Sequence, residues 1–215
     1  MASRVVCAIE PKLRQSEIER ATRKPTESLD AYDLYLRALA EFHKYNKESV
    51  REAIVLLKRA LAIDPSYAPA AAMIGDLCLM AEWVQGWGAG SDADRAEAVR
   101  LARQAIEMGK DDPDALYMAA NTLSLFAGDH ATATSAVDRA LILNPNCAHA
   151  WRTRGYVLVR QSRPEPGIEA FHHAMRLSPL DPLGFFFTAG MKRRSNGPTA
   201  RCASSRATQP RPATR

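Results

Sequence analysis

Apolar residues recur every three or four positions along most of the chain, a spacing that places them on one face of an α-helix. No run of β-branched residues typical of strands interrupts this pattern. The first predicted element is an amphipathic helix over residues 5–22, which ends before Pro25. Ser28 is expected to be the N-cap of the next helix. The pattern therefore predicts an all-α protein.

Turn-forming residues divide the remaining sequence into pairs of helices. Prolines are expected to end the second helix of several pairs, because proline lacks an N–H and crowds the preceding turn. A glycine-dense insertion at 85–91 divides the second pair, whose second helix is expected to start at Asp92 or Asp94 and to end at Gly109 in a left-handed cap. The predicted pairs are 28–65, 67–109, 114–145 and 148–179, with turns at 127–130 and 163–167 in the last two and a shortened fifth unit at 181–191.

The sequence of the third pair is repeated in the fourth. The segment Arg139–Pro145 has a counterpart 34 residues later that ends at Met175–Pro179. Trp151, Gly155, Phe171, Ala174 and Pro179 stand at the spacing of a tetratricopeptide repeat (TPR), a helix–turn–helix unit of ~34 residues. The chain thus resembles TPR proteins. This implies an all-α TPR helix–turn–helix solenoid of about four repeats plus a truncated fifth, with an extended surface of the kind that binds protein segments.

One set of residues is expected to pack the repeats. A glycine or alanine keeps the first helix of a unit thin where its own second helix crosses it, since a bulky side chain there would force the helices apart. Phe171 is expected to fill the space between neighbouring units. The complete predicted set is Gly75, Ala120, Trp151, Gly155, Phe171, Ala174, Pro65, Pro145 and Pro179.

The charge of the chain is unevenly distributed. The formal net charge is +5, but residues 192–215 hold seven basic and no acidic side chains, which leaves 22 basic against 24 acidic residues elsewhere. The rest of the chain therefore has no basic excess suited to specific nucleic-acid binding. The last 24 residues lack Leu, Ile, Val and aromatic residues and are predicted to be a disordered basic tail, either natural or the product of a shifted reading frame. The predicted divisions are 1–27, 28–191 and 192–215.

Neither a cofactor site nor a membrane anchor is indicated. The four cysteines lie far apart without Cys-x-x-Cys spacing, which argues against a zinc or redox motif and for a reducing compartment. The N-terminus lacks the apolar run of a signal peptide, and no stretch approaches the ~20 apolar residues of a membrane span. His172 and His173 are adjacent and point about 100° apart on a helix, so they are not expected to share a metal ion. We expect a cytoplasmic protein with no cofactor.

Three segments extend the resemblance to a particular group of repeat proteins. Residues 5–21, 27–37 and 178–187 are similar to the C-terminal TPR region of bacterial class III adenylate/guanylate cyclases. In that family a cyclase domain and a TolB-like module precede the repeats, and the metal-binding aspartates of the cyclase domain have no counterpart here. The resemblance implies a non-catalytic fragment of such a cyclase. Alternatives are the TPR region of a winged-helix transcriptional regulator and a stand-alone TPR adaptor.

A peptide-binding groove is expected on the concave face, which the first helix of each unit lines. The candidate residues are three or four positions apart and therefore share a helix face. They are His149, Arg152, Tyr156 and Arg160 in the fourth repeat and Tyr117 and Asn121 in the third. A basic and aromatic stripe of this kind suits an acidic or C-terminal peptide segment, and the alternative is an ordinary solvated helix face. Self-association through the uncapped residues 185–187 is a further expectation.

Overall fold

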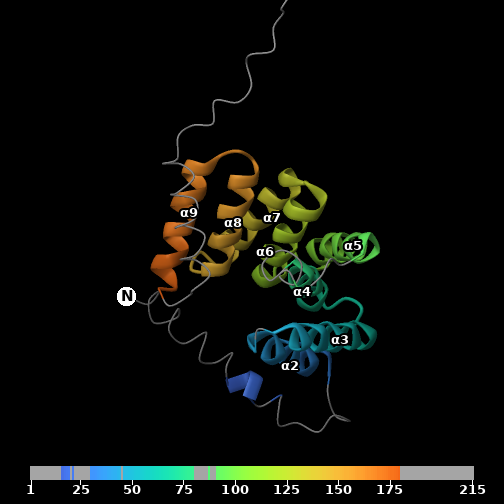
Figure 1. The fold of residues 1–215 in the computed structure, drawn as a ribbon. Helices are drawn as coiled ribbons and strands as arrows, with labels where there is room; N and C mark the ends of the chain where they lie inside the picture. Colours follow the sequence, from blue (N-terminus) through green and yellow to red (C-terminus); the bar gives the residue numbers. More distant parts are fainter. Residues whose placement is uncertain are drawn as a thin grey trace, which may run out of the picture.

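The computed structural model describes residues 16–19, 21, 30–44, 46–79, 87 and 91–179 (Figure 1). These residues form helices joined by short turns, and no strand occurs among them. The helices are α2 (Ala31–His43), α3 (Lys47–Ile63), α4 (Ala68–Leu79), α5 (Asp92–Met108), α6 (Pro113–Thr122), the π-helix η3 (Leu123–Ala127), α7 (His130–Leu143), α8 (Ala148–Arg160) and α9 (Pro164–Leu177). Of the predicted helix 5–22, residues 16–19 and 21 are helical; the fifth unit and the tail lie outside the described residues.

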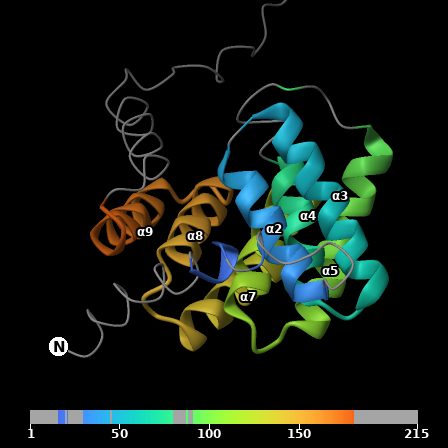
Figure 2. The ribbon, with the colours of Figure 1, turned by 90° about the horizontal axis from the view of Figure 1, so that it is seen from below.

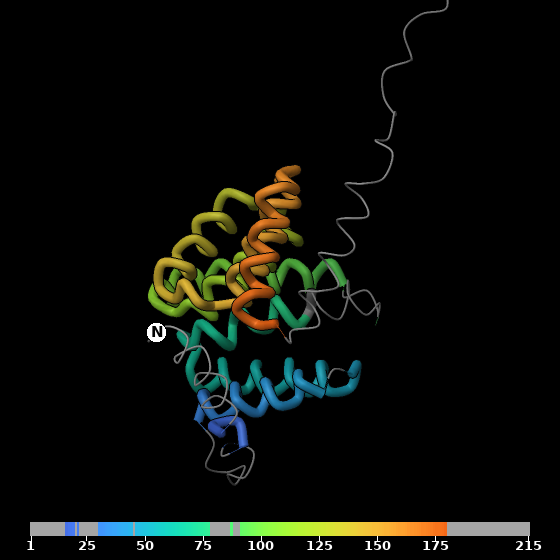
Figure 3. Tube along the Cα trace, turned by 90° about the vertical axis from the view of Figure 1, so that its left-hand side faces the viewer, coloured from blue at the N-terminus to red at the C-terminus, as the bar shows by residue number. Residues whose placement is uncertain are grey.

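The helices pack as four consecutive pairs. The pairs are α2–α3, α4–α5, α6–α7 and α8–α9, and the second helix of each pair also contacts the first helix of the next. The first helices α4, α6 and α8 contact one another in turn. The stack rotates along the chain, because α2 and α3 lie across the view in Figure 1 whereas α8 and α9 run up it. Seen from below in Figure 2, α2 and α3 overlie α4 and α5, and Figure 3 shows the same stacking from the side. Because the first helices are in mutual contact, they form the inner layer of the solenoid.

Small buried residues allow this close stacking. Alanines from every described pair are completely buried, and leucines such as Leu34, Leu57 and Leu77 fill the remaining space. Helix α6 takes part in two apolar clusters, one with the preceding helices and one with α7 and α8. Seven of the ten residues of α6 are buried, so it is the centre of the described stack.

Side-chain caps fix the starts of several helices. Asp30, and not the predicted Ser28, is the N-cap of α2: its carboxylate accepts the Asp33 N–H at 2.8 Å, while the Asp33 carboxylate accepts the Asp30 N–H. This reciprocal capping box satisfies two backbone donors and explains why the helix begins two residues later than expected. Ser91 and Asp94 form the same box at α5, which begins at Asp92.

Two turn predictions were wrong. Gly109 caps α5 with a φ of −98°, outside the left-handed region; it is glycine because a Cβ there would lie 2.7 Å from the Cβ of Ala68 and 2.9 Å from that of Ala115. The turn predicted at 163–167 lies at 161–163, with Ser162 at a φ of 61°. Pro164 and Pro166 belong to the first turn of α9. Proline lacks a backbone N–H, and this costs nothing here because N–H groups in the first turn have no acceptor within the helix.

The third unit contains one residue more than the fourth. Helix α8 begins at residue 148, 35 positions after α6 begins at 113, whereas α9 begins at 164, only 34 positions after α7 begins at 130. The extra residue is accommodated by the π-helix at Leu123–Ala127, and Gly128 follows in the left-handed conformation. A π turn absorbs a single inserted residue within a helix, and the predicted turn at 127–130 is therefore preserved.

The predicted packing residues occupy two kinds of contact. A Cβ on Gly155 would lie 2.7 Å from the ring of Phe171, so this glycine faces its own second helix as expected. Gly75 instead faces the next unit, where a Cβ would lie 2.7 Å from Oγ1 of Thr122 on α6. Phe171, expected between units, packs within its own unit against Gly155 and the ring of Tyr156. Glycine thus permits close approach both within a unit and between units.

The remaining members of the set lie at buried positions and helix ends. Ala120 and Ala174 are buried. The indole N–H of Trp151 donates to the carbonyl of Pro145 at 2.8 Å, which connects α8 to the preceding turn. Each of the three prolines directly follows the C-cap residue of a second helix, α3, α7 or α9; they are Pro65, Pro145 and Pro179.

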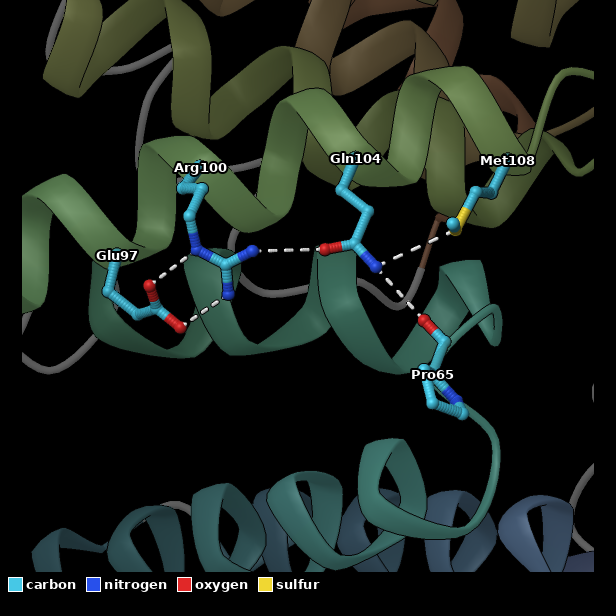
Figure 4. A network of polar contacts seen from close by, with 5 residues as sticks. All are labelled: Pro65, Glu97, Arg100, Gln104 and Met108. Carbon is cyan, nitrogen blue, oxygen red and sulfur yellow. Dashed lines mark hydrogen bonds and ion pairs between the residues drawn. The ribbon is translucent and has the colours of Figure 1, made fainter.

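A surface network connects the first two units. Figure 4 shows Gln104 of α5 donating to the carbonyl of Pro65, at 2.9 Å, and accepting from Arg100 at 3.2 Å. Arg100 forms two further bonds of 2.7 Å to Glu97, one turn earlier. The turn after α3 is therefore attached to the second helix of the next unit.

Candidate functional site

Three successive first helices carry a polar residue at the equivalent position. This residue directly follows the small residue of each unit: Asp76 follows Gly75 on α4, Asn121 follows Ala120 on α6, and Tyr156 follows Gly155 on α8. One turn earlier, Tyr117 and Arg152 are equivalent on α6 and α8. All six predicted groove residues therefore lie on two neighbouring helices of the inner layer.

The predicted residues are joined to Asp76 by a hydrogen-bonded ladder. The amide of Asn121 donates to Oδ1 of Asp76 at 3.0 Å and accepts from Nη1 of Arg160 at 3.2 Å. Asn121 is only 7% exposed, and both ends of its amide are engaged. Because these residues belong to α4, α6 and α8, the ladder fixes three units relative to one another and holds the guanidinium of Arg160 in place.

Aromatic side chains border the ladder. The rings of Tyr117 and His149 lie 5.8 Å apart, which brings α6 and α8 together on this face. The guanidinium of Arg160 lies over the ring of Tyr156, 5.6 Å from its centroid. The same Tyr156 ring meets Phe171 edge-on at 5.1 Å. The stripe is thus anchored on the core of the fourth unit.

Burial controls the ionisation of this site. Desolvation raises the pKa of Asp76, although the hydrogen bond from Asn121 and the charges of Arg152 and Arg160 oppose the shift. Desolvation also raises the pKa of Tyr117 well above its ordinary value, so its hydroxyl remains neutral at physiological pH. Burial lowers the pKa of Arg160, whose guanidinium still remains charged. The site therefore offers two guanidiniums, one carboxyl group and the neutral hydroxyl of Tyr117.

Asp76 was not among the predicted site residues. Its neighbourhood is rich in alanine, and the notable residue there was Gly75, expected only for packing. Its position in the repeat could have indicated it, because Asp76 follows Gly75 as Tyr156 follows Gly155. A residue at this position faces the inner layer in each of these units.

The other features considered from the sequence were the histidine pair, a metal site and a membrane span. His173 lies against Trp151, with ring centroids 4.1 Å apart. In the part of the chain that the structure describes, no group of three or more side chains could hold a metal ion, and no helix is long and apolar enough to cross a membrane.

Comparison by sequence gives a match over part of the chain. No family model matches the chain. "Putative adenylate cyclase 3" of Rhizobium meliloti (strain 1021) is 31% identical over 120 residues, which are 56% of this chain and 20% of that protein. The match therefore spans about a fifth of the relative's length.

Solved structures share the fold at low sequence identity. TTC0263, a thermophilic TPR protein of Thermus thermophilus, has a TM-score of 0.61 at 15% identity, covering 88% of this chain and 96% of that one. PilF of Pseudomonas aeruginosa has a TM-score of 0.53 at 20% identity, covering 77% and 69%. Together with the four stacked helix pairs, these likenesses confirm the predicted fold class: the chain is an all-α TPR helix–turn–helix solenoid.

Proposed function

We propose that this chain is a non-catalytic scaffold that holds a protein or peptide segment on the inner layer formed by α4, α6 and α8. The ladder Asp76–Asn121–Arg160 is the observation that carries the proposal. It holds polar side chains of three units in fixed positions, and preorganised donors reduce the entropic cost of binding. A surface distributed over several stacked units suits an extended ligand better than a compact one.

The charges favour an acidic or C-terminal segment. Arg152 and Arg160 contribute two positive charges against the single carboxyl group of Asp76, whose pKa is raised by desolvation. Guanidinium groups bind carboxylates with directed hydrogen bonds, and Tyr156 and Tyr117 offer aromatic surface beside them. A partner segment that carries a carboxylate and an apolar side chain matches both features.

A displayed library of random twelve-residue peptides tests this function. Peptides selected on the full chain should be enriched in Asp and Glu, and binding of individual clones should fall several-fold for Arg160→Gln and Asn121→Ala. Arg103→Gln is the matched control, since Arg103 is an exposed residue of α5 on another surface. If the clones bind all three variants with the same affinity as the parent chain, the inner layer is not the binding surface.

We further propose that the chain derives from the C-terminal region of an adenylate/guanylate cyclase. The match to "Putative adenylate cyclase 3" over 120 residues supports this origin. DNA sequence on both sides of the gene, translated in all frames, should reveal a cyclase domain upstream and resumed repeats after codon 191. An upstream winged-helix domain would favour the transcriptional-regulator alternative, and unrelated flanks a stand-alone adaptor. The purified chain should form no cyclic nucleotide from ATP or GTP.

Two further proposals concern the state of the protein in the cell. A cytoplasmic location predicts recovery in the soluble fraction with cytoplasmic markers. Self-association through residues 185–187, which lie outside the described residues, predicts a concentration-dependent mass in light scattering that Phe186→Ser reduces.

A further inference from the structure

A second hollow lies on the opposite side of α8 from the ladder. It is a groove of about 550 Å³ between α7 and α9, with α8 as its floor, and we call it the α7–α9 groove. On α8 it is lined by Trp151, Arg154 and Leu158. Successive helical residues turn by about 100°, which places these side chains on the face away from Arg152 and Tyr156. The α7–α9 groove is thus separate from the inner layer.

The groove has an excess of positive charge. Three arginines line it against the carboxylates of Asp138 and Glu169. Arg154 is neutralised, because its Nε lies 3.0 Å from Oδ1 of Asp138. Arg163 and Arg176 have no carboxylate within ion-pair distance among the residues that the structure describes.

The neighbour of Arg176 does not neutralise it. Nη2 of Arg176 lies 3.1 Å from Nδ1 of His173. Burial and the charge of Arg176 lower the pKa of His173, so its ring is neutral and can accept this hydrogen bond. The guanidinium of Arg176 is therefore held in position without losing its charge, as a binding group for an anion would be.

The shape of the groove defines the form of the ligand. Arg163 and Arg176 lie at opposite ends of α9, 13 residues apart, which corresponds to about 20 Å along a helix. An extended peptide covers that distance with about six residues. The lining also includes apolar side chains, namely the half-buried Trp151 and the almost completely buried Val137, Val157 and Ala170.

We propose that the α7–α9 groove binds an extended acidic peptide segment, whose terminal carboxylates pair with Arg163 and Arg176 and whose central apolar side chains lie on α8. The groove would give the scaffold a second peptide-binding surface, back to back with the first. The proposal does not depend on ligand binding by the inner layer.

Fluorescence anisotropy of the full chain with the fluorescein-labelled peptide Asp-Glu-Leu-Val-Glu-Asp tests the proposal. Saturable binding is expected. Arg163→Gln and Arg176→Gln should each weaken it about threefold, and the double variant about tenfold, in line with exposed ion pairs. Arg103→Gln should leave it unchanged, because Arg103 is an exposed residue of α5. Arg160→Gln reports separately whether the same peptide also binds the inner layer. Circular dichroism establishes that every variant is folded.

Four outcomes would overturn the assignment. Non-saturable binding would mean that the groove has no peptide site. An equal loss with Arg103→Gln would mean that the peptide responds only to overall charge. Displacement by millimolar inorganic phosphate as effectively as by unlabelled peptide would mean that the arginines bind small anions. Loss with Arg160→Gln alone would place this peptide on the inner layer and support the proposed function instead.

Discussion

Gly155 and Phe171 are complementary: the aromatic ring occupies the space that a side chain at position 155 would need. A Cβ on Gly155 would lie 2.7 Å from two carbons of that ring, and Phe171 is completely buried. We predict that Gly155→Ala destabilises the chain by about 1–3 kcal/mol, since the added methyl group would force the buried ring to shift. Urea unfolding measures the change.

A double variant separates this contact from helix propensity. Phe171→Leu removes the ring atoms that the added methyl group would meet, so Gly155→Ala should cost less in that background. Equal costs in both backgrounds would show that the two positions do not interact.

Gly128 is required for its backbone conformation and not for lack of space. It has a φ of +62°, and nothing lies within 4 Å of where its Cβ would be. Gly128→Ala should therefore lose about 1–2 kcal/mol through backbone strain alone, and Gly128→Asn should lose less, because Asn tolerates the left-handed region better. Thermal melts of the parent chain and the two variants test this order of stability. Steric crowding at position 128 would instead make the larger Asn more destabilising than Ala.

Asp76 makes stability depend on pH. Its folded-state pKa is raised above the ordinary value of 3.8, so the folded protein holds this proton more tightly than the unfolded chain. The resulting stabilisation is complete below the unfolded pKa and is lost as pH rises through the folded pKa. At pH 7 the ionised group is unfavourable, and Asp76→Asn should be at least as stable as the parent chain. Urea unfolding at pH 7 and near pH 4 should show this advantage of the variant disappear in acid.

His173 should titrate in the other direction. Burial and Arg176 lower its pKa below the ordinary value of 6.5. The stabilisation is present above the unfolded pKa and is lost as pH falls through the folded pKa. NMR titration should show the His173 ring changing charge at lower pH than an exposed histidine, and Arg176→Gln should move the midpoint upward. An unchanged midpoint would mean that Arg176 has no electrostatic effect on the ring.

Gln104 provides a modest connection between units. Gln104→Ala removes its hydrogen bond to the carbonyl of Pro65 and its contact with Arg100. Both are exposed, so the expected loss is about 0.5–1.5 kcal/mol. The control is Arg103→Ala on the same helix, for which urea unfolding should show a smaller change.

The periodic parts of the fold were predictable, and the local departures were not. The 34-residue match between Arg139–Pro145 and Met175–Pro179 established the helix pairs, since stacked units repeat the same buried contacts. The cap at Asp30 and the conformation of Gly109 depend on single hydrogen bonds and on neighbours distant in sequence. Similarly, Gly75 faces Thr122 of another unit, which repeat spacing alone does not indicate.

The candidate site was predicted in part. Helical spacing placed Tyr156 and Arg160 on one face of α8, but the link from Arg160 through Asn121 to Asp76 depends on how three units stack. The α7–α9 groove was not predicted, because it is formed by side chains of three helices. Its basic residues resembled ordinary exposed arginines in the sequence.

The π-helix at Leu123–Ala127 bears on how such an array evolves. An added residue in an α-helix would rotate everything after it by about 100° and destroy the match to the next unit. Here the extra residue is confined to one helical turn, and α7 and α8 keep their places in the stack. Repeats of unequal length can therefore persist side by side, and one unit can gain or lose a residue by mutation without compensating changes in the others.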